Sequence, residues 1–164
     1  GDAIALLTGD ALIASAAELL ATYPSAGTIL NSAFGFKGVT GGQALELDGS
    51  DMPSDILTVY YYKTAKLFEA AVVSALINTN ASIDDMKSAC EYCYCIGIAF
   101  QISDDLADSE SDDGSFVKAV GVDKAREIIS AILSGARAAA AKLSKEVPFL
   151  KDFVDFLTVL QTER

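Results

Sequence analysis

Gly97-Ile98-Ala99-Phe100-Gln101-Ile102-Ser103-Asp104-Asp105-Leu106-Ala107-Asp108 is the stretch that decides how the rest of this chain is interpreted. It is an apolar run that ends abruptly in an amide and three carboxylates. As a helix, it places Asp104 and Asp108 one turn apart on one face, with Gln101 one turn before them. Two stacked carboxylates either reach into solvent or line a cation site. Periodicity leaves both interpretations open, because their repulsion on an exposed helix costs only about 0.2–0.5 kcal/mol.

Composition favours an all-helical protein. The chain has 164 residues, of which 51% are hydrophobic, and its long apolar segments are rich in alanine and leucine. We expect one domain over residues 1–164, with enough residues for a hydrophobic core. The net charge is −11 and the twelve basic residues are scattered. Phosphate backbones are bound by clustered basic faces, so we expect no nucleic acid partner.

Several kinds of site are excluded or disfavoured by residue content. The sequence contains no histidine, which excludes histidine acid–base catalysis and histidine metal ligands. Its three cysteines, Cys90, Cys93 and Cys95, lie in one predicted helix, and a structural zinc site needs four ligands. We therefore predict buried thiols of a reducing compartment.

The N-terminal segment 3–21 is apolar but contains Asp10 and Glu18 and has no basic start. We therefore expect neither a signal peptide nor a membrane span, and a soluble protein of the cytoplasm or an organelle matrix. The chain begins at Gly1, without methionine, in the lead-in to a helix. We interpret this start as the continuation of a longer protein.

Helical periodicity and end signals outline a bundle of helices. Ser82 with Asp85 three residues later predicts a capping box at the start of the helix that carries the opening stretch. Residues 35–42 include four glycines and predict a loop or tight turn, and the acidic segment 109–115 predicts a surface loop. The helices are expected at about 2–21, 26–36, 55–78, 83–107 and 123–143, with a short one after Pro148.

Carboxylates on one helical face suit magnesium, which prefers hard oxygen ligands and shares itself with substrate phosphates. A lysine on a neighbouring helix, such as Lys63, would then neutralise phosphate oxygens as a point charge. The alternative for Lys63 is a solvated helix face, which Lys66 one turn later supports.

Four segments in this order and spacing resemble the trans-isoprenyl diphosphate synthases, also called polyprenyl synthetases. The resemblance covers most of the chain and weakens after Asp108. The segments are Gly9-Asp10-Ala11-Leu12, Gly38-Val39-Thr40-Gly41-Gly42-Gln43-Ala44-Leu45-Glu46-Leu47, Lys63-Thr64-Ala65-Lys66-Leu67-Phe68 and the opening stretch.

The resemblance implies a helical bundle of the isoprenoid-synthase type that condenses isopentenyl diphosphate with an allylic diphosphate. In that family Mg²⁺ ions held by two Asp-rich motifs draw off the allylic diphosphate. Asp104-Asp105-Leu106-Ala107-Asp108 matches the second motif, which implies metal ligands at Asp104, Asp105 and Asp108.

The remaining matches imply contacts to substrate. Lys63 matches the lysine that holds the allylic diphosphate, with Thr64 beside it, and Gln43 and Gln101 match glutamines that line the site. Metal and lysine would stabilise the charge of the leaving group, so Lys63 and Asp104 are the implied catalytic residues.

Departures from the family pattern predict an incomplete bundle. The first Asp-rich motif and the basic residues for isopentenyl diphosphate would precede Gly9, and this chain has neither. Residues 113–117 lack a further diphosphate lysine, and Glu46 stands where aspartate is usual. We therefore expect the C-terminal half to two-thirds of a synthase, with its N-terminal helices absent. It should be inactive alone and should require a second chain that supplies those helices, in a homo- or hetero-oligomer.

Two alternatives stay open. The chain is also compatible with a non-catalytic polyprenyl-synthetase-like subunit that has a regulatory or structural role in a larger assembly. The second alternative is a terpene cyclase of the same fold, since Asp104, Asp108 and Asp112 loosely imitate the second metal motif of those enzymes. The matches at Lys63-Thr64 and Phe100-Gln101 favour the synthases over the cyclases.

Overall fold

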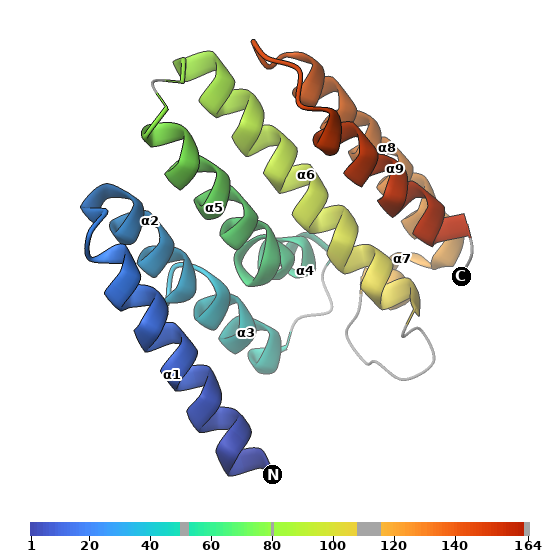
Figure 1. Cartoon of the computed structure of the whole chain (residues 1–164). Coiled ribbons are helices and arrows are strands. Elements are labelled where there is room, and N and C mark those ends of the chain that lie inside the picture. The colour runs from blue at the N-terminus through green and yellow to red at the C-terminus, as the bar shows by residue number, and fades with distance from the viewer. Residues whose placement is uncertain (50–52, 80, 108–115, 163–164) are drawn as a thin grey trace.

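The structure is a computed structural model that describes residues 1–49, 53–79, 81–107 and 116–162 (Figure 1). Within these ranges every regular element is a helix and there is no strand, as the sequence predicted. The helices are α1 Asp2–Leu20, α2 Pro24–Phe34, α3 Val39–Asp48, α4 Pro53–Tyr60, the π-helix η1 Tyr61–Ala65, α5 Lys66–Ile77, α6 Ile83–Ala107, α7 Phe116–Val120, α8 Val122–Ala141 and α9 Pro148–Thr162.

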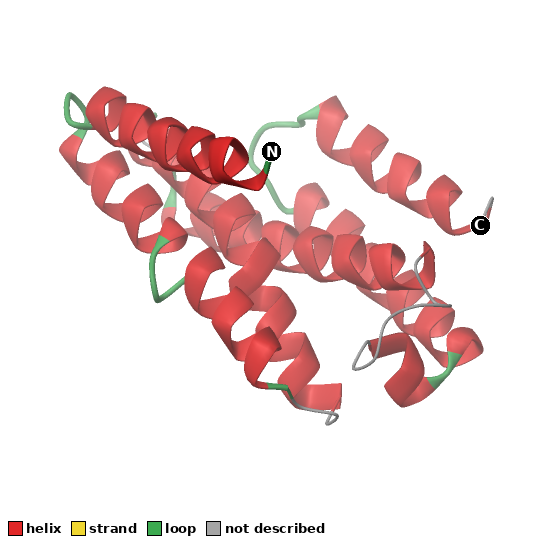
Figure 2. Ribbon diagram, turned by 90° about the horizontal axis from the view of Figure 1, so that it is seen from below, coloured by secondary structure: helices red, strands yellow, loops and turns green. Residues whose placement is uncertain are grey.

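Four helices form a central layer in the order α2, α5, α6 and α8, each packed against the next (Figure 1). The N-terminal helix α1 and the C-terminal helix α9 lie on one side of this layer. The short helices α4 and α7 lie on the other side (Figure 2). The two sides of the layer are therefore covered by different elements: α1 and α9 cover one side, and α4 and α7 cover the other.

The hydrophobic core is centred on α6. Ile96, Ile98 and Ile102 are each at most 1% exposed and pack in one cluster with residues of α8 and α9, including Ile129 and Leu157. Each isoleucine of this kind contributes roughly 1.5–3 kcal/mol by burial. The bounds of α6 agree with the predicted helix at 83–107.

The predicted capping box at the start of α6 is confirmed. The amide of Asp85 donates to the Ser82 hydroxyl oxygen at 3.0 Å, and that hydroxyl donates to the Asp85 carboxylate at 2.8 Å. The same carboxylate also accepts bonds from the amide and hydroxyl of Ser144, at 2.6 and 2.7 Å. The cap therefore also joins the start of α6 to the segment after α8.

The prediction of a loop up to Gly42 was wrong, because α3 already begins at Val39 and includes Gly41 and Gly42. Glycine is needed at two positions because other elements pack closely against their backbones. A Cβ at Gly42 would lie 2.3 Å from the backbone nitrogen of Lys63, and one at Gly97 of α6 would lie 2.3 Å from the Cα of Ala65. Real Cβ atoms essentially never come so close. The segment η1 is thus held between α3 and α6 by two glycine contacts.

The single helix predicted at 55–78 is divided into α4, η1 and α5. In the π-helix η1 the backbone hydrogen bonds join residues five apart, whereas those of an α-helix join residues four apart. This difference changes the direction of the side chains relative to a continuous α-helix. Such bulges occur frequently at functional sites. Here the bulge contains both Lys63 and Thr64. The hydrophobic period of 3.6 residues in the sequence does not reveal such a π-helical segment within a longer helix.

Helix α1 has no buried residue and packs chiefly on α2. Six of its seven large hydrophobic side chains are more than half exposed, all except the half-buried Leu20; the six are Ile4, Leu6, Leu7, Leu12, Ile13 and Leu19. By length and composition α1 is the one helix of the described residues that could cross a membrane, a test that core helices and signal sequences also pass. A helix that is hydrophobic all round is normally buried by other protein or by lipid.

Candidate active site

Lys63 lies in a polar cluster formed by η1 and α3. Its ammonium donates to both carboxylate oxygens of Glu46, at 2.8 and 2.7 Å. The Gln43 amide nitrogen donates to the same carboxylate at 2.6 Å. Gln43 and Glu46 are three residues apart on α3, so they share a face of that helix. The pair of Lys63 and Glu46 is partly exposed, 26% and 37%, and contributes little to stability.

Thr64 and Gln101 form a second polar contact, between η1 and α6. The Thr64 hydroxyl donates to the side-chain oxygen of Gln101 at 2.9 Å. Gln101 is only 8% exposed, so this bond satisfies a buried polar group. Because Lys63 and Thr64 are consecutive, the two contacts together bring Gln43, Lys63, Thr64 and Gln101 to one region of the fold.

Asp104 follows Gln101 by three residues on α6 and is exposed. The predicted ligand Asp108 lies outside the described residues. Within the described ranges, no group of three His, Cys, Asp or Glu residues could hold a metal ion. Asp104 stays a predicted ligand, and its exposed carboxylate lies near the C-terminal end of α6.

Asp105, a predicted metal ligand, is buried and is hydrogen-bonded to other parts of the chain. It is 8% exposed and accepts hydrogen bonds from the Tyr60 hydroxyl and from the backbone N–H of Phe116, the latter at 3.0 Å. Burial and the bond to Asp105 raise the pKa of Tyr60 well above its ordinary value. Asp105 therefore joins the end of α6 to α4 and to the start of α7. Its role as a metal ligand stays a prediction.

Sequence reasoning did not assign two residues that organise the site. Glu46 was noted only as a departure from the family pattern, yet it holds Lys63 and Gln43 together. Its spacing from Gln43 would have indicated the contact, had residues 39–48 been predicted as helix. For Tyr60, no local pattern in the sequence indicates its bond to Asp105, 45 residues away.

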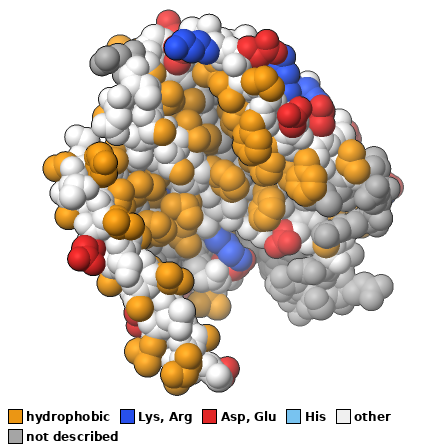
Figure 3. All heavy atoms as spheres, viewed as in Figure 1, with side chains coloured by type: hydrophobic (Ala, Val, Ile, Leu, Met, Phe, Trp, Pro, Cys, Tyr) orange, Lys and Arg blue, Asp and Glu red, His pale blue; other side chains and the backbone are white. Residues whose placement is uncertain are grey.

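One face of the molecule is rich in hydrophobic side chains (Figure 3). It is the face from which α1 and α9 project in Figure 1, and a hollow near its centre holds a basic side chain close to acidic ones. Large contiguous apolar surfaces of this kind typically mark interaction sites.

Comparison with known proteins identifies the family. The family model for polyprenyl synthetase matches residues 1–150. The chain belongs to the polyprenyl synthetase family. The resemblance inferred from the four motifs is thereby confirmed, and the all-helical fold is that of the family's solved structures.

Relatives and solved structures agree with this assignment. Geranylgeranyl pyrophosphate synthase 7 of Arabidopsis thaliana is 31% identical over 165 residues, which cover 83% of this chain and 48% of that protein. The apo structure of an FPP/GFPP synthase from Zymomonas mobilis has a TM-score of 0.84 and 32% identity, and the match covers 95% of this chain and 61% of that one. A geranyltransferase from Helicobacter pylori, solved with magnesium and isoprenyl diphosphate, shares the fold at 23% identity with a TM-score of 0.75, covering 96% and 60%.

This polyprenyl synthetase family member spans about half the length of the curated relatives it matches. The shared part includes the four segments that carry the resemblance. The contacts among Gln43, Lys63, Thr64 and Gln101 are therefore a feature of the matched region.

Proposed function

We propose that this chain is part of a prenyltransferase that condenses isopentenyl diphosphate with an allylic diphosphate. It would contribute the diphosphate-binding lysine and the second magnesium motif. The observation that carries the proposal is the π-helix η1, held by two glycine contacts, which presents Lys63 and Thr64 beside Gln43 and Gln101. Short π-helical segments of this kind occur frequently at functional sites.

Lys63 is proposed to bind the allylic diphosphate. Its ammonium is a compact point charge and suits the oxygens of a phosphate group. In the structure without substrate, Glu46 neutralises this ammonium, and Gln43 donates to the same carboxylate. A diphosphate has a larger negative charge than Glu46, so it would compete for Lys63. Thr64 and Gln101 would line the same region.

Asp104 and Asp108 are the proposed magnesium ligands of this chain. Bound Mg²⁺ would neutralise charge that develops on the diphosphate as it leaves. Mg²⁺ usually takes one or two carboxylates from a protein and completes its shell with water and substrate phosphates, which fits an exposed carboxylate such as Asp104. The further carboxylates that the resemblance implies would come from another segment or another chain.

A partner or an N-terminal segment is proposed to complete the bundle. The support is the exposure of α1 and the hydrophobic face seen in Figure 3. Burial of that face would remove apolar area from water. The chain alone is expected to be inactive, and its region 1–164 is expected to behave as one domain.

The experiment measures the melting temperature of the assembled protein with Mg²⁺ and a non-reactive allylic diphosphate analogue. At a ligand concentration of 100 Kd the expected gain is about 2.7 kcal/mol, or roughly 5–10 °C for a domain of this size. Lys63→Gln and Asp104→Asn should remove most of the shift. The matched control Lys124→Gln changes a lysine that pairs with Glu127 on the exposed face of α8, and it should retain the shift.

The second candidate is a non-catalytic subunit of the same family. It is favoured by the ion pair between Lys63 and Glu46, which already neutralises the proposed diphosphate-binding ammonium. An assembly that requires this chain but shows no Mg²⁺-dependent shift at saturating analogue would establish this candidate and refute the first.

A further inference from the structure

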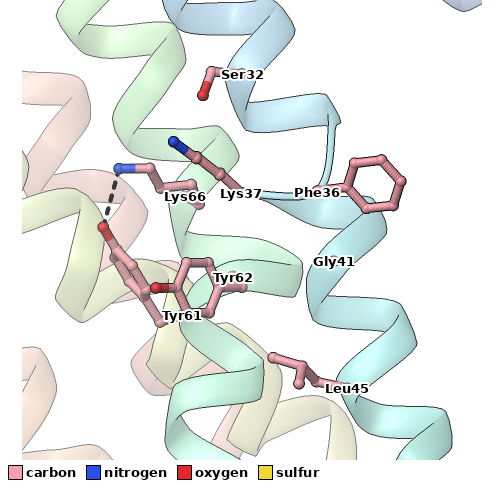
Figure 4. Close-up of a pocket in the computed structure, with 8 residues that line it drawn as sticks. All are labelled: Ser32, Phe36, Lys37, Gly41, Leu45, Tyr61, Tyr62 and Lys66. Carbon is pink, nitrogen blue, oxygen red and sulfur yellow. Dashed lines mark hydrogen bonds between the residues drawn. The ribbon is translucent and has the colours of Figure 1, made fainter.

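A pocket lies between the turn from α2 to α3 and the segment of η1 and α5 (Figure 4). Its volume is about 610 Å³, within the usual range for small-molecule sites. Gly41 and Leu45 of α3 line it, whereas Gln43 and Glu46 of the same helix contact each other at the Lys63 cluster. Positions two residues apart on a helix point to nearly opposite sides. The pocket is therefore separate from the candidate active site.

Polar groups converge at one end of this pocket. In Figure 4 the Ser32 hydroxyl and the Lys37 ammonium lie at the same end of the pocket as the Lys66 ammonium, which is turned toward the Tyr61 hydroxyl. The other end is formed by the rings of Tyr61 and Tyr62, whose centroids are 5.1 Å apart, and by Leu45. The pocket thus has a cationic end and an apolar, aromatic end.

The structure holds Lys66 in a defined position. Its ammonium donates to the Tyr61 hydroxyl at 3.1 Å and to Glu69 at 3.3 Å, and it lies 5.5 Å from the centre of the Tyr61 ring. Burial lowers the pKa of this ammonium, but the bond to Tyr61 and the charge of Glu69 outweigh burial and raise it. An ammonium has three N–H donors, and these two bonds use two of them.

Lys37 supplies a second positive charge. It makes no ion pair with any residue that the structure describes, and it projects from the turn between α2 and α3 toward Lys66 (Figure 4). A chain with 23 acidic and 12 basic residues attracts anions poorly over most of its surface. Two lysines with a neighbouring hydroxyl therefore form a local exception that suits a compact anion.

We propose that this pocket binds a small amphipathic phosphate ester. Its phosphate or diphosphate head would lie among Ser32, Lys37 and Lys66, and its apolar or flat body would lie along Tyr61, Tyr62 and Leu45. This inference is independent of the proposed function, since it uses none of the residues of the Lys63 cluster or of α6. It requires neither Mg²⁺ nor a partner chain.

The test is titration of the ¹⁵N-labelled chain in EDTA, followed by NMR, with inorganic diphosphate, geranyl diphosphate and adenosine monophosphate as separate probes. EDTA removes metal-dependent binding, so failure here leaves the Mg²⁺-dependent experiment on Asp104 unaffected. We expect saturable shifts at the amides of Ser32, Lys37 and Lys66, and at least tenfold tighter binding of one organic phosphate than of inorganic diphosphate. The tighter of the two identifies an isoprenoid or a nucleotide as the source of the ligand.

Two variants test the assigned contacts. Lys37→Gln, at an exposed position, should weaken binding at least tenfold, and Tyr62→Leu should weaken the organic phosphates more than inorganic diphosphate. Lys124→Gln removes the same charge at a distant position and should change affinity less than twofold. Three results would overturn the proposal: no saturable binding, shifts centred on Gln43, Thr64 and Gln101, or equal affinity for all three probes.

Discussion

Replacing Gly97 by alanine is expected to disturb the contact that presents Lys63 and Thr64. A Cβ at Gly97 would lie 2.3 Å from the Cα and 2.4 Å from the Cβ of Ala65. Ordinary contacts begin at 3.4 Å, so α6 and η1 would have to separate by about 1 Å. The atoms that would be struck belong to the backbone and to a side chain without rotatable bonds. No change of rotamer relieves the clash.

The magnitude follows from two opposing effects. Overpacking of a tight interior contact costs about 1–3 kcal/mol, and a contact between two backbones lies toward the upper end of that range. Alanine is also favoured over glycine in a helix interior by about 1 kcal/mol. Gly135→Ala in α8 is the matched control, because its Cβ would meet only the Cys95 sulfur at an ordinary 3.4 Å. The control therefore measures the gain in helix propensity without the clash.

The assay is urea and thermal unfolding of the two variants beside the parent chain. The difference between the variants isolates the steric cost, which we expect to be about 1–3 kcal/mol, or roughly 2–12 °C in Tm. The NMR signals of Thr64 and Gln101 should also move in Gly97→Ala, since their hydrogen bond crosses the same contact. If Gly97→Ala were as stable as Gly135→Ala, the inference that glycine contacts hold η1 in place would be refuted.

Three further predictions concern other parts of the fold. Tyr60→Phe leaves the buried Asp105 without its hydroxyl donor and should lower the free energy of unfolding by about 1.5–3 kcal/mol in urea; a loss below about 0.5 kcal/mol would contradict the structural role of Asp105. The bonds from Ser144 lower the pKa of Asp85 below 3.8, so their contribution is present above that pH and is lost as the pH falls through the lowered pKa. Asp85→Asn should therefore make Tm decline less steeply below pH 3.8. An unchanged decline would contradict the stabilising role of the Asp85 carboxylate in the cap. Burial raises the pKa of Cys93 to about 12, so its thiol should react with a disulfide reagent far more slowly in the native chain at pH 7.5 than in the unfolded chain, as mass mapping of labelled peptides would reveal; equal rates would contradict its burial.

Local patterns in the sequence were sufficient for most of the helices. The boundaries of α6 followed from its capping box and from the polar residues that end it. The short helix α7 was not predicted, since its five residues carry too little periodicity. The glycine-rich segment was misinterpreted, because glycine disfavours helix by local propensity and favours close packing in tertiary contact. A single sequence does not distinguish these two uses of glycine.

The candidate site was predicted as a set of residues but not as an arrangement. The motif match selected Gln43, Lys63, Thr64 and Gln101, and the structure joins them in two hydrogen-bonded contacts. The motif match did not reveal that the Lys63 ammonium donates hydrogen bonds to the Glu46 carboxylate. Ion pairs between separate helices depend on how those helices pack, and the distance along the chain contains no such information.

The opening stretch illustrates the division between sequence and tertiary structure. By itself the sequence determined that 97–107 forms the end of a core helix, that Asp104 and Gln101 share one side of it, and that the chain belongs with the polyprenyl synthetases. Only the tertiary structure decided that the adjacent Asp105 is buried and bonded to Tyr60 and Phe116 while Asp104 is exposed. The physical reason is that successive residues of a helix point about 100° apart, so one carboxylate faces the packed helices and its neighbour faces solvent. Which one is buried depends on the helices that pack against α6.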